Sequence, residues 1–577
     1  MIKKYQVKTQ FKEILEPEEI LLDAQEKKKR EKGKLEVKIQ DKIFIFVFFI
    51  FSFLFLCLFL RTSFLVLAKG KEYQQKAIDN YLRKVYFEAP RGLIYSKDGE
   101  LLVENIEDKN AKINSKEKEK RYYRNYLNNL YFSFILGYER EATEEELKTD
   151  PQYYEPGDWV GKDGVEKTYE KYLRGKKGIL EKIVNAKGEV VSQKITRNPQ
   201  IGDTLILNID AKLQKKIYDA IQKKVPGKDA IAIALDPRNG AVLAMVSIPS
   251  NDNNVFSRKN LSAEYLQYLE SQKRIYNINK AISARYPSGS IIKPLIAAAA
   301  LEENVITPST TIFDPGYIEI PNPYNPSKPT IKKDWKAHGT VDLKKAIAES
   351  CNTYFFTVGG GYKDIQGLGI SRIKKYLDLF FIEDLLGIDL PGEAVGFVPT
   401  REWFEKEMQK SYQRNWSIAD VYDVSIGQGF FMASPLHMAV ALSSIANGGK
   451  IYQPQVVDKI KSPDGKVIKD IEPKVLSQGF ISQKNIEEVR EGMRACVTSP
   501  SGSCRQLASL PVSSAGKTGT AESDKGDLTH SWFVAFAPYE NPKIFILVLV
   551  PYGGEGSSVA EPIAKEVLEW YFKEYKK

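Results

Sequence analysis

The sequence predicts an α+β protein with a single N-terminal transmembrane helix, an elongated platform (pedestal) domain, and a C-terminal domain in which helices pack on an antiparallel sheet. Two observations support this prediction. Residues 43–60 form a run of eighteen residues without a charge, and two strong hairpin patterns, at 230–248 and 530–552, enclose a long series of helix-type patterns. With 577 residues and 43% apolar content, the chain can bury several large cores.

Residues 1–42 are predicted to be a mostly disordered cytoplasmic tail, because they are highly charged and have little apolar periodicity. Twelve of them are Lys or Arg. The whole chain has a formal net charge of +10, made of lysines interleaved with glutamates. A nucleic-acid-binding protein has a denser basic patch, so we expect no nucleic-acid partner.

Residues 43–67 are predicted to cross a membrane, since a span needs about 20 mainly apolar residues. The basic residues before the span predict a cytoplasmic N-terminus and place the chain after Ala68 outside. The apolar run is longer than that of a signal peptide, and no small-residue cleavage site follows it, which favours an uncleaved anchor.

Residues 68–205 are predicted to form a non-catalytic platform that is partly extended. Residues 71–86 have a helix-type pattern, and the Lys-Asp-Gly sequence at 97–99 predicts a hairpin turn. Residues 161–178 are punctuated by glycines and show little periodicity that would build a core. Because no nucleophile and base occur together here, we expect support rather than catalysis.

The domain predicted for residues 206–577 begins with an amphipathic helix that Asp210 caps. Residues 230–248 and 530–552 are each predicted to form a β-hairpin, and residues 560–575 a closing helix. Strands from both ends of the domain, with helices between them, predict an antiparallel sheet packed by helices.

A serine and a lysine at the start of an apolar helix are the first candidate for chemistry. Ser290 follows a Pro-Ser-Gly turn and precedes an Ile/Leu/Ala-rich stretch, and Lys293, three residues on, shares its helix face. Burial and the helix N-terminus both lower the pKa of a lysine, so Lys293 can act as the base that activates the Ser290 hydroxyl. The pattern alone is weak, because Ser-x-x-Lys occurs at three other places in this lysine-rich chain.

Two further motifs supply the other groups that a reactive serine needs. Ser-Cys-Asn at 350–352 follows a helix-type pattern where a loop is expected, and Lys-Thr-Gly-Thr at 517–520 precedes the last hairpin, where a strand is expected. A reactive serine needs a hydroxyl that relays protons, a group that holds the substrate amide, and a cation with hydroxyls for a substrate carboxylate. These roles can be filled by Ser350, Asn352, Lys517, Thr518 and Thr520.

The ordered set Ser-x-x-Lys, Ser-x-Asn and Lys-Thr-Gly occurs in β-lactamases and penicillin-binding proteins. The chain resembles the class B penicillin-binding proteins, and among them the elongation-type penicillin-binding protein 2. The resemblance covers nearly everything after the anchor. It includes PRG at 90–92, LDPRNGAVLAMVS at 235–247, YPSGSIIKP at 286–294 and SIGQG at 425–429.

The resemblance implies a serine β-lactamase/transpeptidase-like fold for the C-terminal domain and a role for each motif residue. Ser290 would be acylated, Lys293 would be its base, Ser350 would shuttle a proton, and Asn352 would bind the substrate amide. Around the terminal carboxylate would lie Lys517, Thr518, Gly519 and Thr520. The backbone N–H groups of Ser290 and Thr520 would form the oxyanion hole.

The resemblance also implies a bacterial plasma-membrane D,D-transpeptidase that cross-links peptidoglycan stem peptides ending in D-Ala-D-Ala during cell-wall elongation. It implies acylation by β-lactams, a SEDS-type glycosyltransferase as partner, and no required cofactor. Two other functions remain open. A D,D-carboxypeptidase or β-lactamase would transfer the acyl group to water, but the platform, the anchor and the lack of a recognisable deacylation glutamate argue against it. A penicillin sensor or scaffold would keep the acyl group, and the single span argues against it.

A zinc site and a disulfide are left open by the sequence. Residues with the ligand types of a tetrahedral zinc site are Asp314, Asp334, His338 and Cys351. Some elongation-type relatives bind zinc at positions that these residues resemble. The spacing from His338 to Cys351 fits, but the spacing of the two aspartates differs, and a buried thiol with a satisfied histidine is the alternative. Cys496 and Cys504 lie eight apart in the extracytoplasmic domain, where a disulfide is possible.

Overall fold

The computed structural model describes residues 41–107, 122–257, 278–321 and 327–575. By internal contacts the chain divides into two compact units, residues 1–84 with 181–194, and residues 85–180 with 195–577. The predicted tail, residues 1–42, lies almost wholly outside the described residues. The domain limits predicted at 67 and 205 stay predictions, and the second falls inside strand β9 (Thr204–Leu207).

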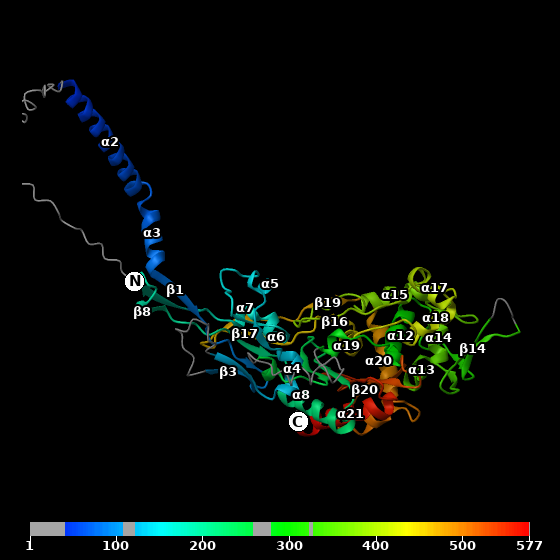
Figure 1. The fold of residues 1–577 in the computed structure, drawn as a ribbon. Coiled ribbons are helices and arrows are strands. Elements are labelled where there is room, and N and C mark those ends of the chain that lie inside the picture. Colours follow the sequence, from blue (N-terminus) through cyan, green and yellow to red (C-terminus); the bar gives the residue numbers. More distant parts are fainter. Residues whose placement is uncertain (1–40, 108–121, 258–277, 322–326, 576–577) are drawn as a thin grey trace, which may run out of the picture. The chain divides into compact units, whose positions relative to one another are not determined.

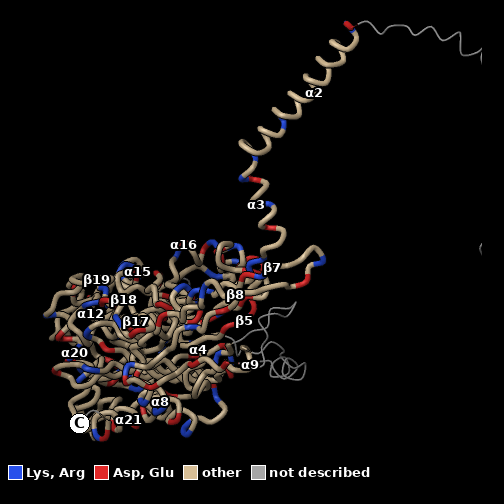
Figure 2. The backbone as a smooth tube through the Cα atoms, turned by 90° about the vertical axis from the view of Figure 1, so that its left-hand side faces the viewer, with Lys and Arg blue, Asp and Glu red and all other residues tan. Residues whose placement is uncertain are grey.

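The first unit contains the predicted anchor. Helix α2 (Asp41–Leu67) has 27 residues and none of them is buried, and it is long and apolar enough to cross a membrane. Figure 2 shows it almost free of charged residues. Helix α3 (Gly70–Tyr81) follows and ends earlier than predicted. The helix expected for 71–86 is wrong at its end, because Leu82–Phe87 forms strand β1, which pairs with strand β7 (Gly178–Val184).

A five-stranded antiparallel sheet is the centre of the C-terminal domain, with strand order β11-β10-β22-β21-β20. Both predicted hairpins are present in this sheet. The first and last hairpins meet where Ile231 pairs with Leu549, so the two ends of the domain are joined in the sheet. The strands are β10 (Ala230–Leu235), β11 (Val242–Ile248), β20 (Ala515–Glu522), β21 (Thr529–Ala537) and β22 (Ile544–Val550).

Helices cover both faces of this sheet (Figure 1). Along β10, Ile231 and Ile233 enter one apolar core, and Ala232 and Ala234 enter the other. Burial on both faces explains why these strands are apolar at nearly every position instead of alternating. One core contains α8 (Ala211–Lys224), capped by Asp210 as predicted, and α21 (Glu561–Trp570). The other contains α12 (Lys293–Glu302) and α19 (Pro435–Ala446).

Helix α12 lies inside a ring of other helices, and its residues from Lys293 to Leu301 are all buried. The neighbours that contact it include α14 (Asn352–Gly360), α15 (Gly369–Leu379), α19 and α20 (Gln483–Thr498). The apolar sequence of α12 is therefore that of a central core helix, and a lysine at its first position has to find its partners inside the protein.

The platform sheet combines strands from distant parts of the chain, in the order β18-β17-β9-β2-β3-β4. Its hairpin about residues 97–99 is present, with Ile94 opposite Val103. Two strands after residue 456 also belong to it, and the sequence did not predict this pairing. The strands other than β9 are β2 (Ile94–Tyr95), β3 (Leu101–Glu107), β4 (Tyr122–Tyr126), β17 (Val457–Lys461) and β18 (Val467–Asp470).

A buried ion network holds the platform together. Glu166 is fully buried and accepts hydrogen bonds from the guanidinium groups of Arg91, at 2.6 Å, and Arg124, at 2.7 Å. Burial alone would raise the pKa of Glu166, but the charges of Arg124 and Arg91 hold it below its usual range. Residues 161–178 show little periodicity in sequence, yet Val165 and Leu173 are also fully buried. The short helices α6 (Gly164–Thr168) and α7 (Glu170–Leu173) present no long periodic stripe that would reveal this.

We expect Glu166→Gln to destabilise the platform strongly, because it leaves two buried guanidinium groups without their shared carboxylate. Breaking a buried ion pair from one side costs about 3 to 5 kcal/mol. The matched control is Glu405→Gln, since the Arg401–Glu405 pair is exposed (67% and 42%) and such pairs contribute about 0 to 1 kcal/mol. Thermal unfolding of the full chain in detergent, with limited proteolysis of the platform, measures both. Equal melting temperatures for the two variants would contradict a structural role for the network.

Candidate active site

Ser290 lies in a short 3₁₀ turn, Gly289–Ile292, directly before α12. The sequence placed it at the helix start itself, so the turn is a small correction. Gly289 has φ of +54°, and a Cβ there would lie 2.6 Å from the Thr520 carbonyl oxygen, so only glycine fits. The indole N–H of Trp532 donates to the Pro287 carbonyl at 3.0 Å and fixes the preceding loop. The backbone beside Ser290 therefore packs closely against strand β20.

Lys293 is fully buried one helical turn beyond Ser290. Its Nζ donates to the Ser350 carbonyl and to Asn352 Oδ1, both at 2.7 Å. Burial lowers the pKa of Lys293 to about 8, although the charge of Asp334 acts in the opposite direction. Within the described residues Lys293 forms no hydrogen bond with the Ser290 hydroxyl, and such bonds often tighten only when substrate binds.

The Ser350 hydroxyl lies between two buried amines. It accepts a hydrogen bond from Lys517 Nζ at 2.8 Å and one from Lys293 Nζ at 3.3 Å. Burial, together with the nearby charge of Lys293, lowers the pKa of Lys517 well below its usual value. Two cations cannot both be stable in this apolar site, so one amine can be neutral near neutral pH. The hydroxyl between them offers the proton a direct path.

The predicted loop at 350–352 is shorter than expected. Helix α13 (Leu343–Glu349) ends at Ser350, which has φ of +60°, and Cys351 already caps α14. Asn352 is therefore the first residue of a helix. This tight reversal points the Ser350 hydroxyl and the Asn352 amide toward the same amine.

The motif at 517–520 lies on β20, as predicted, and β20 is the edge strand of the sheet. Gly519 is required for close packing, because a Cβ there would lie 2.8 Å from the Ile291 side chain. Thr518 is mostly buried, and its hydroxyl lies 2.7 Å from the Ser503 hydroxyl. The Thr520 hydroxyl accepts from the Gly556 N–H at 3.3 Å. An edge strand also offers free backbone groups to an extended ligand.

A cavity of about 590 Å³ joins these groups. The predicted site residues that line it are Ser290, Ser350, Asn352, Thr518, Gly519 and Thr520. Among the other lining residues, to which sequence reasoning assigned no role, are the polar residues Gln428 and Ser503. Gln428 accepts from the Glu522 N–H at 3.2 Å, and the SIGQG motif was the signal that could have identified it. No signal in the sequence indicates Ser503.

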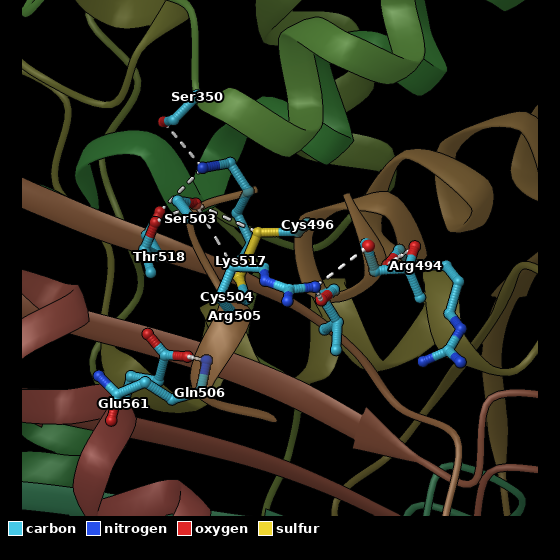
Figure 3. Close-up of a disulfide and its surroundings, with 12 residues drawn as sticks. Ser350, Arg494, Cys496, Ser503, Cys504, Arg505, Gln506, Lys517, Thr518 and Glu561 are labelled. Atoms are coloured by element: carbon cyan, nitrogen blue, oxygen red, sulfur yellow. Dashed lines mark hydrogen bonds between the residues drawn. A yellow bond between two sulfur atoms is a disulfide. The ribbon is translucent and has the colours of Figure 1, made fainter. Parts of the chain in front are cut away.

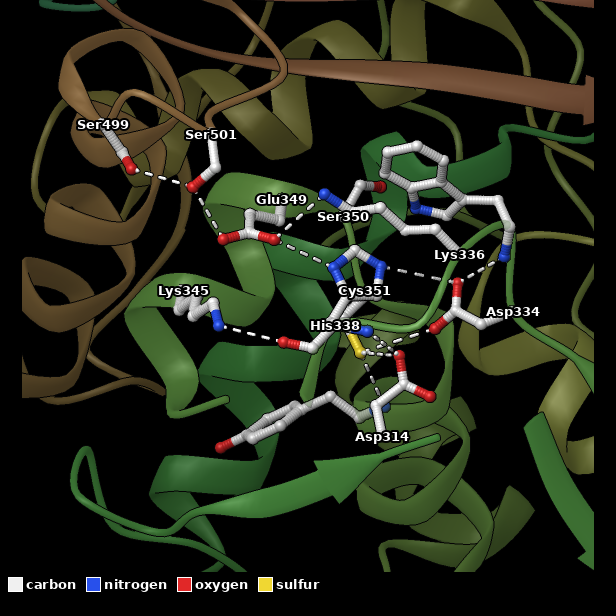
Figure 4. Close-up of polar contacts among 12 residues, drawn as sticks. Asp314, Asp334, Lys336, His338, Lys345, Glu349, Ser350, Cys351, Ser499 and Ser501 are labelled. Carbon is white, nitrogen blue, oxygen red and sulfur yellow. Dashed lines mark hydrogen bonds and ion pairs between the residues drawn. The ribbon is translucent and has the colours of Figure 1, made fainter. Parts of the chain in front are cut away.

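The structure also brings together the four residues with metal-ligand chemistry (Figure 4). Their ligand atoms lie within 4.8 Å of one another and all four are buried: Asp314, Asp334, His338 and Cys351. His338 Nδ1 lies 3.0 Å from the Glu349 carboxylate, whereas the buried Nε2 has no hydrogen-bond partner. A histidine held by a carboxylate on one nitrogen and open on the other is typical of a metal ligand. The donor set fits zinc, although it differs from the relatives' spacing in sequence.

Residues 230–569, more than half of the chain, match the family model of the penicillin binding protein transpeptidase domain. The chain belongs to this family. Residues 113–207 of this penicillin-binding protein match the model of the penicillin-binding protein dimerisation domain, a range that overlaps the predicted platform and ends two residues beyond its predicted limit. The resemblance inferred from the motifs is thereby confirmed.

The relatives of this penicillin-binding protein include two peptidoglycan D,D-transpeptidases named MrdA. The protein from Haemophilus influenzae is 35% identical over 478 residues, which are 78% of this chain and 70% of that relative. The protein from Escherichia coli strain K12 is 33% identical over 427 residues, 71% of this chain and 64% of that relative. The expected family of peptidoglycan D,D-transpeptidases is confirmed.

Solved structures agree with the fold class. The penicillin-binding protein PBP2 of Helicobacter pylori, in a complex with MreC, has a TM-score of 0.70 and 26% identity and covers 86% of this chain and 100% of its own. A structure described as the structural coordination of polymerization and crosslinking by a peptidoglycan synthase complex has a TM-score of 0.69 and 26% identity, with 92% and 99% covered. The predicted α+β fold of anchor, platform and transpeptidase domain is confirmed.

We expect acylation by a fluorescent penicillin to speed up as the pH rises through about 8, because only the neutral form of Lys293 accepts a proton and its pKa lies near 8. Lys293→Arg keeps the charge but cannot lose it. This variant should acylate about 10² to 10⁴ times more slowly and show no such rise. Lys344→Arg, at an exposed position, is the matched control with an unchanged pH profile. Stopped-flow fluorescence measures the rate, and a wild-type rate independent of pH would argue against Lys293 as the base.

Proposed function

We propose that this penicillin-binding protein cross-links stem peptides through an ester on Ser290, with Lys293 as the base. The observation that supports this most directly is the Ser350 hydroxyl held between the two buried amines of Lys293 and Lys517. A penicillin sensor has no need for such a proton relay after acylation, whereas a transferase must move a proton in each half-reaction.

In the first half-reaction, Ser290 Oγ attacks the carbonyl carbon of the penultimate D-Ala of a donor stem peptide. Its proton passes to Lys293, and the carbonyl oxygen becomes an anion that the backbone N–H groups of Ser290 and Thr520 stabilise. Ser350 then carries a proton to the leaving nitrogen, so the peptide bond breaks and D-Ala departs. The donor remains as an ester of Ser290.

In the second half-reaction, an amine of a neighbouring stem peptide attacks the ester carbonyl. The amine loses a proton to Lys293, the C–O bond to Ser290 breaks, and the proton returns to Ser290 Oγ. The donor lies along the free edge of β20, with its terminal carboxylate among Lys517, Thr518 and Thr520 and its amide at Asn352. The product is a cross-link and the serine is regenerated.

We expect a stem-peptide donor to release D-Ala faster when a D-amino acid acceptor is present, and the acceptor to appear in the product. A transpeptidase must favour the amine over water. Ser290→Ala should abolish D-Ala release, transfer and labelling by penicillin, while Ser309→Ala, an exposed serine outside the cavity, should leave them unchanged. Mass spectrometry of the products measures the split between transfer and hydrolysis.

Three outcomes would contradict parts of this proposal. Labelling that persists in Ser290→Ala would remove Ser290 as the nucleophile. Hydrolysis that is unaffected by the acceptor would favour a D,D-carboxypeptidase, and a permanent acyl enzyme with peptide donors would favour a sensor.

The orientation and the partners belong to the same proposal. We propose that the charged N-terminus is cytoplasmic and that α2 contacts a SEDS-type glycosyltransferase in the plasma membrane. All side chains of α2 are unburied in the described chain, and an apolar helix must face lipid or another membrane protein. The similarity to a structure of a peptidoglycan synthase complex and to a protein bound to MreC supports a multi-protein assembly.

We further propose that the cluster of Asp314, Asp334, His338 and Cys351 holds a structural zinc ion. His338 Nε2 supports this, because it is buried without a hydrogen-bond partner and lies 3.8 Å from the Asp334 carboxylate. The cluster links three segments. Asp314 ends β12 (Ile312–Asp314), Cys351 caps α14, and the other two ligands lie between β14 (Thr330–Lys333) and β15 (Gly339–Val341). A metal there would brace the backbone on both sides of Ser350 without taking part in the reaction.

We expect about one zinc ion per chain in the purified protein, measured by inductively coupled plasma mass spectrometry. Cys351→Ser should lose the zinc and lower the melting temperature. Cys57→Ser, the same change at an exposed free cysteine of the anchor, should keep both unchanged. Protein that is free of zinc after growth and purification with zinc present would contradict this site.

A further inference from the structure

The cavity is bordered by a loop that the catalytic roles leave without a function. It runs from the end of α20 to the 3₁₀ helix η3 (Arg505–Ser509) and is closed by a disulfide between Cys496 and Cys504, whose Cα atoms are 5.1 Å apart. Figure 3 shows the disulfide beside Lys517 and Thr518. Both cysteines are fully buried. The disulfide that the sequence left open is therefore present, and the loop that it closes carries Ser503, which lines the cavity.

This loop is bonded to the segment that carries Ser350. The Ser503 N–H donates to the Ala348 carbonyl at 3.0 Å, and the Ser501 hydroxyl donates to Glu349 at 2.7 Å. On its other side, Cys504 N–H donates to the Cys496 carbonyl at 3.0 Å, next to the disulfide. The loop itself has no regular secondary structure between 499 and 504. Its shape therefore depends on these bonds and on the disulfide.

These hydrogen bonds and the disulfide fix the position of the Ser503 hydroxyl. Ser503 Oγ lies 2.7 Å from Thr518 Oγ1 and 3.2 Å from Cys496 Sγ, and Ser503 lines the cavity. A sulfur in a disulfide carries no hydrogen and is only a weak acceptor. The Ser503 and Thr518 hydroxyls each carry one hydrogen. One of these two hydrogens forms the bond between the hydroxyls, so the other can be donated to a ligand. When a carboxylate accepts the Thr518 hydrogen, the Ser503 hydrogen is donated to Thr518 Oγ1 and not to the weakly accepting sulfur.

We infer that Ser503, fixed by the Cys496–Cys504 disulfide, is a positioning residue that orients the Thr518 hydroxyl toward the terminal carboxylate of the donor. In this arrangement Ser503 donates to Thr518 Oγ1, and Thr518 donates its own hydrogen to the carboxylate. Without Ser503, the Thr518 hydroxyl is free to rotate and loses part of its directed donor strength. This inference rests on the proposed function, since it requires that the carboxylate site lies at Thr518.

The test compares two thioester donors that differ only in the leaving group, thioglycolate with its carboxylate or the corresponding carboxamide without charge. Losing a hydrogen bond that supports a charged ligand corresponds to a change of about tenfold. Ser503→Ala should therefore lower kcat/KM for acylation by the carboxylate donor about tenfold and leave the carboxamide donor nearly unchanged. Ser503→Thr restores a hydroxyl and should recover most of the difference. Ser509→Ala, an exposed serine at the end of η3, is the matched control and should change neither rate.

The disulfide is tested in the same assay with the double variant Cys496→Ala and Cys504→Ala. It should show the selective loss for the carboxylate donor that Ser503→Ala shows. Equal losses for the two donors, or no loss in Ser503→Ala, would overturn the inference. Acylation of Ser290→Ala in this assay would instead overturn the proposed nucleophile, so the two failures are distinguishable.

Discussion

The whole active site depends on two amines buried around one hydroxyl. An ammonium group taken out of water loses several kcal/mol of hydration unless the protein replaces its partners. Lys293 donates to two carbonyl-type oxygens and to the Ser350 hydroxyl. Lys517 donates to one carbonyl oxygen and to the same hydroxyl. Burial therefore lowers the pKa of both amines. The Ser350 hydroxyl, which is hydrogen-bonded to both, can pass a proton between them.

The rest of the domain buries the two amines and packs closely around them. Helix α12 carries Lys293 in the centre of the helical layer, and β20 brings Lys517 to it from the edge of the sheet. Two glycines allow this approach, because side chains at Gly289 and Gly519 would collide with Thr520 and Ile291. This close packing helps to bury Lys293, and its burial lowers the pKa of the amine.

Ser350 is also braced from two sides by groups outside the reaction. Glu349, the residue before it, accepts from His338 of the metal-type cluster and from Ser501 of the disulfide-closed loop. The cluster and the loop thus meet at a single carboxylate. A left-handed residue such as Ser350 is unfavourable on its own and persists where its neighbours fix it. We infer that the contacts of Glu349 with His338 and Ser501 hold Ser350 in this left-handed conformation.

The sequence by itself determined the anchor, the two hairpins of the catalytic sheet, the capped helix after Asp210 and the motif residues that line the cavity. These depend on local patterns, such as uninterrupted apolar runs, turn residues and short spacings, which one chain segment contains completely. The tertiary structure decided the buried place of Glu166, the pairing of β17 and β18 with the platform sheet, the strand at 82–87 and the role of the loop around Ser503. Each of these depends on partners that are remote in the chain, as Glu166 depends on Arg91 and Ser503 on Thr518. A spacing within one segment carries no information about such contacts, because long-range packing and hydrogen bonding select the partner only after the chain has folded.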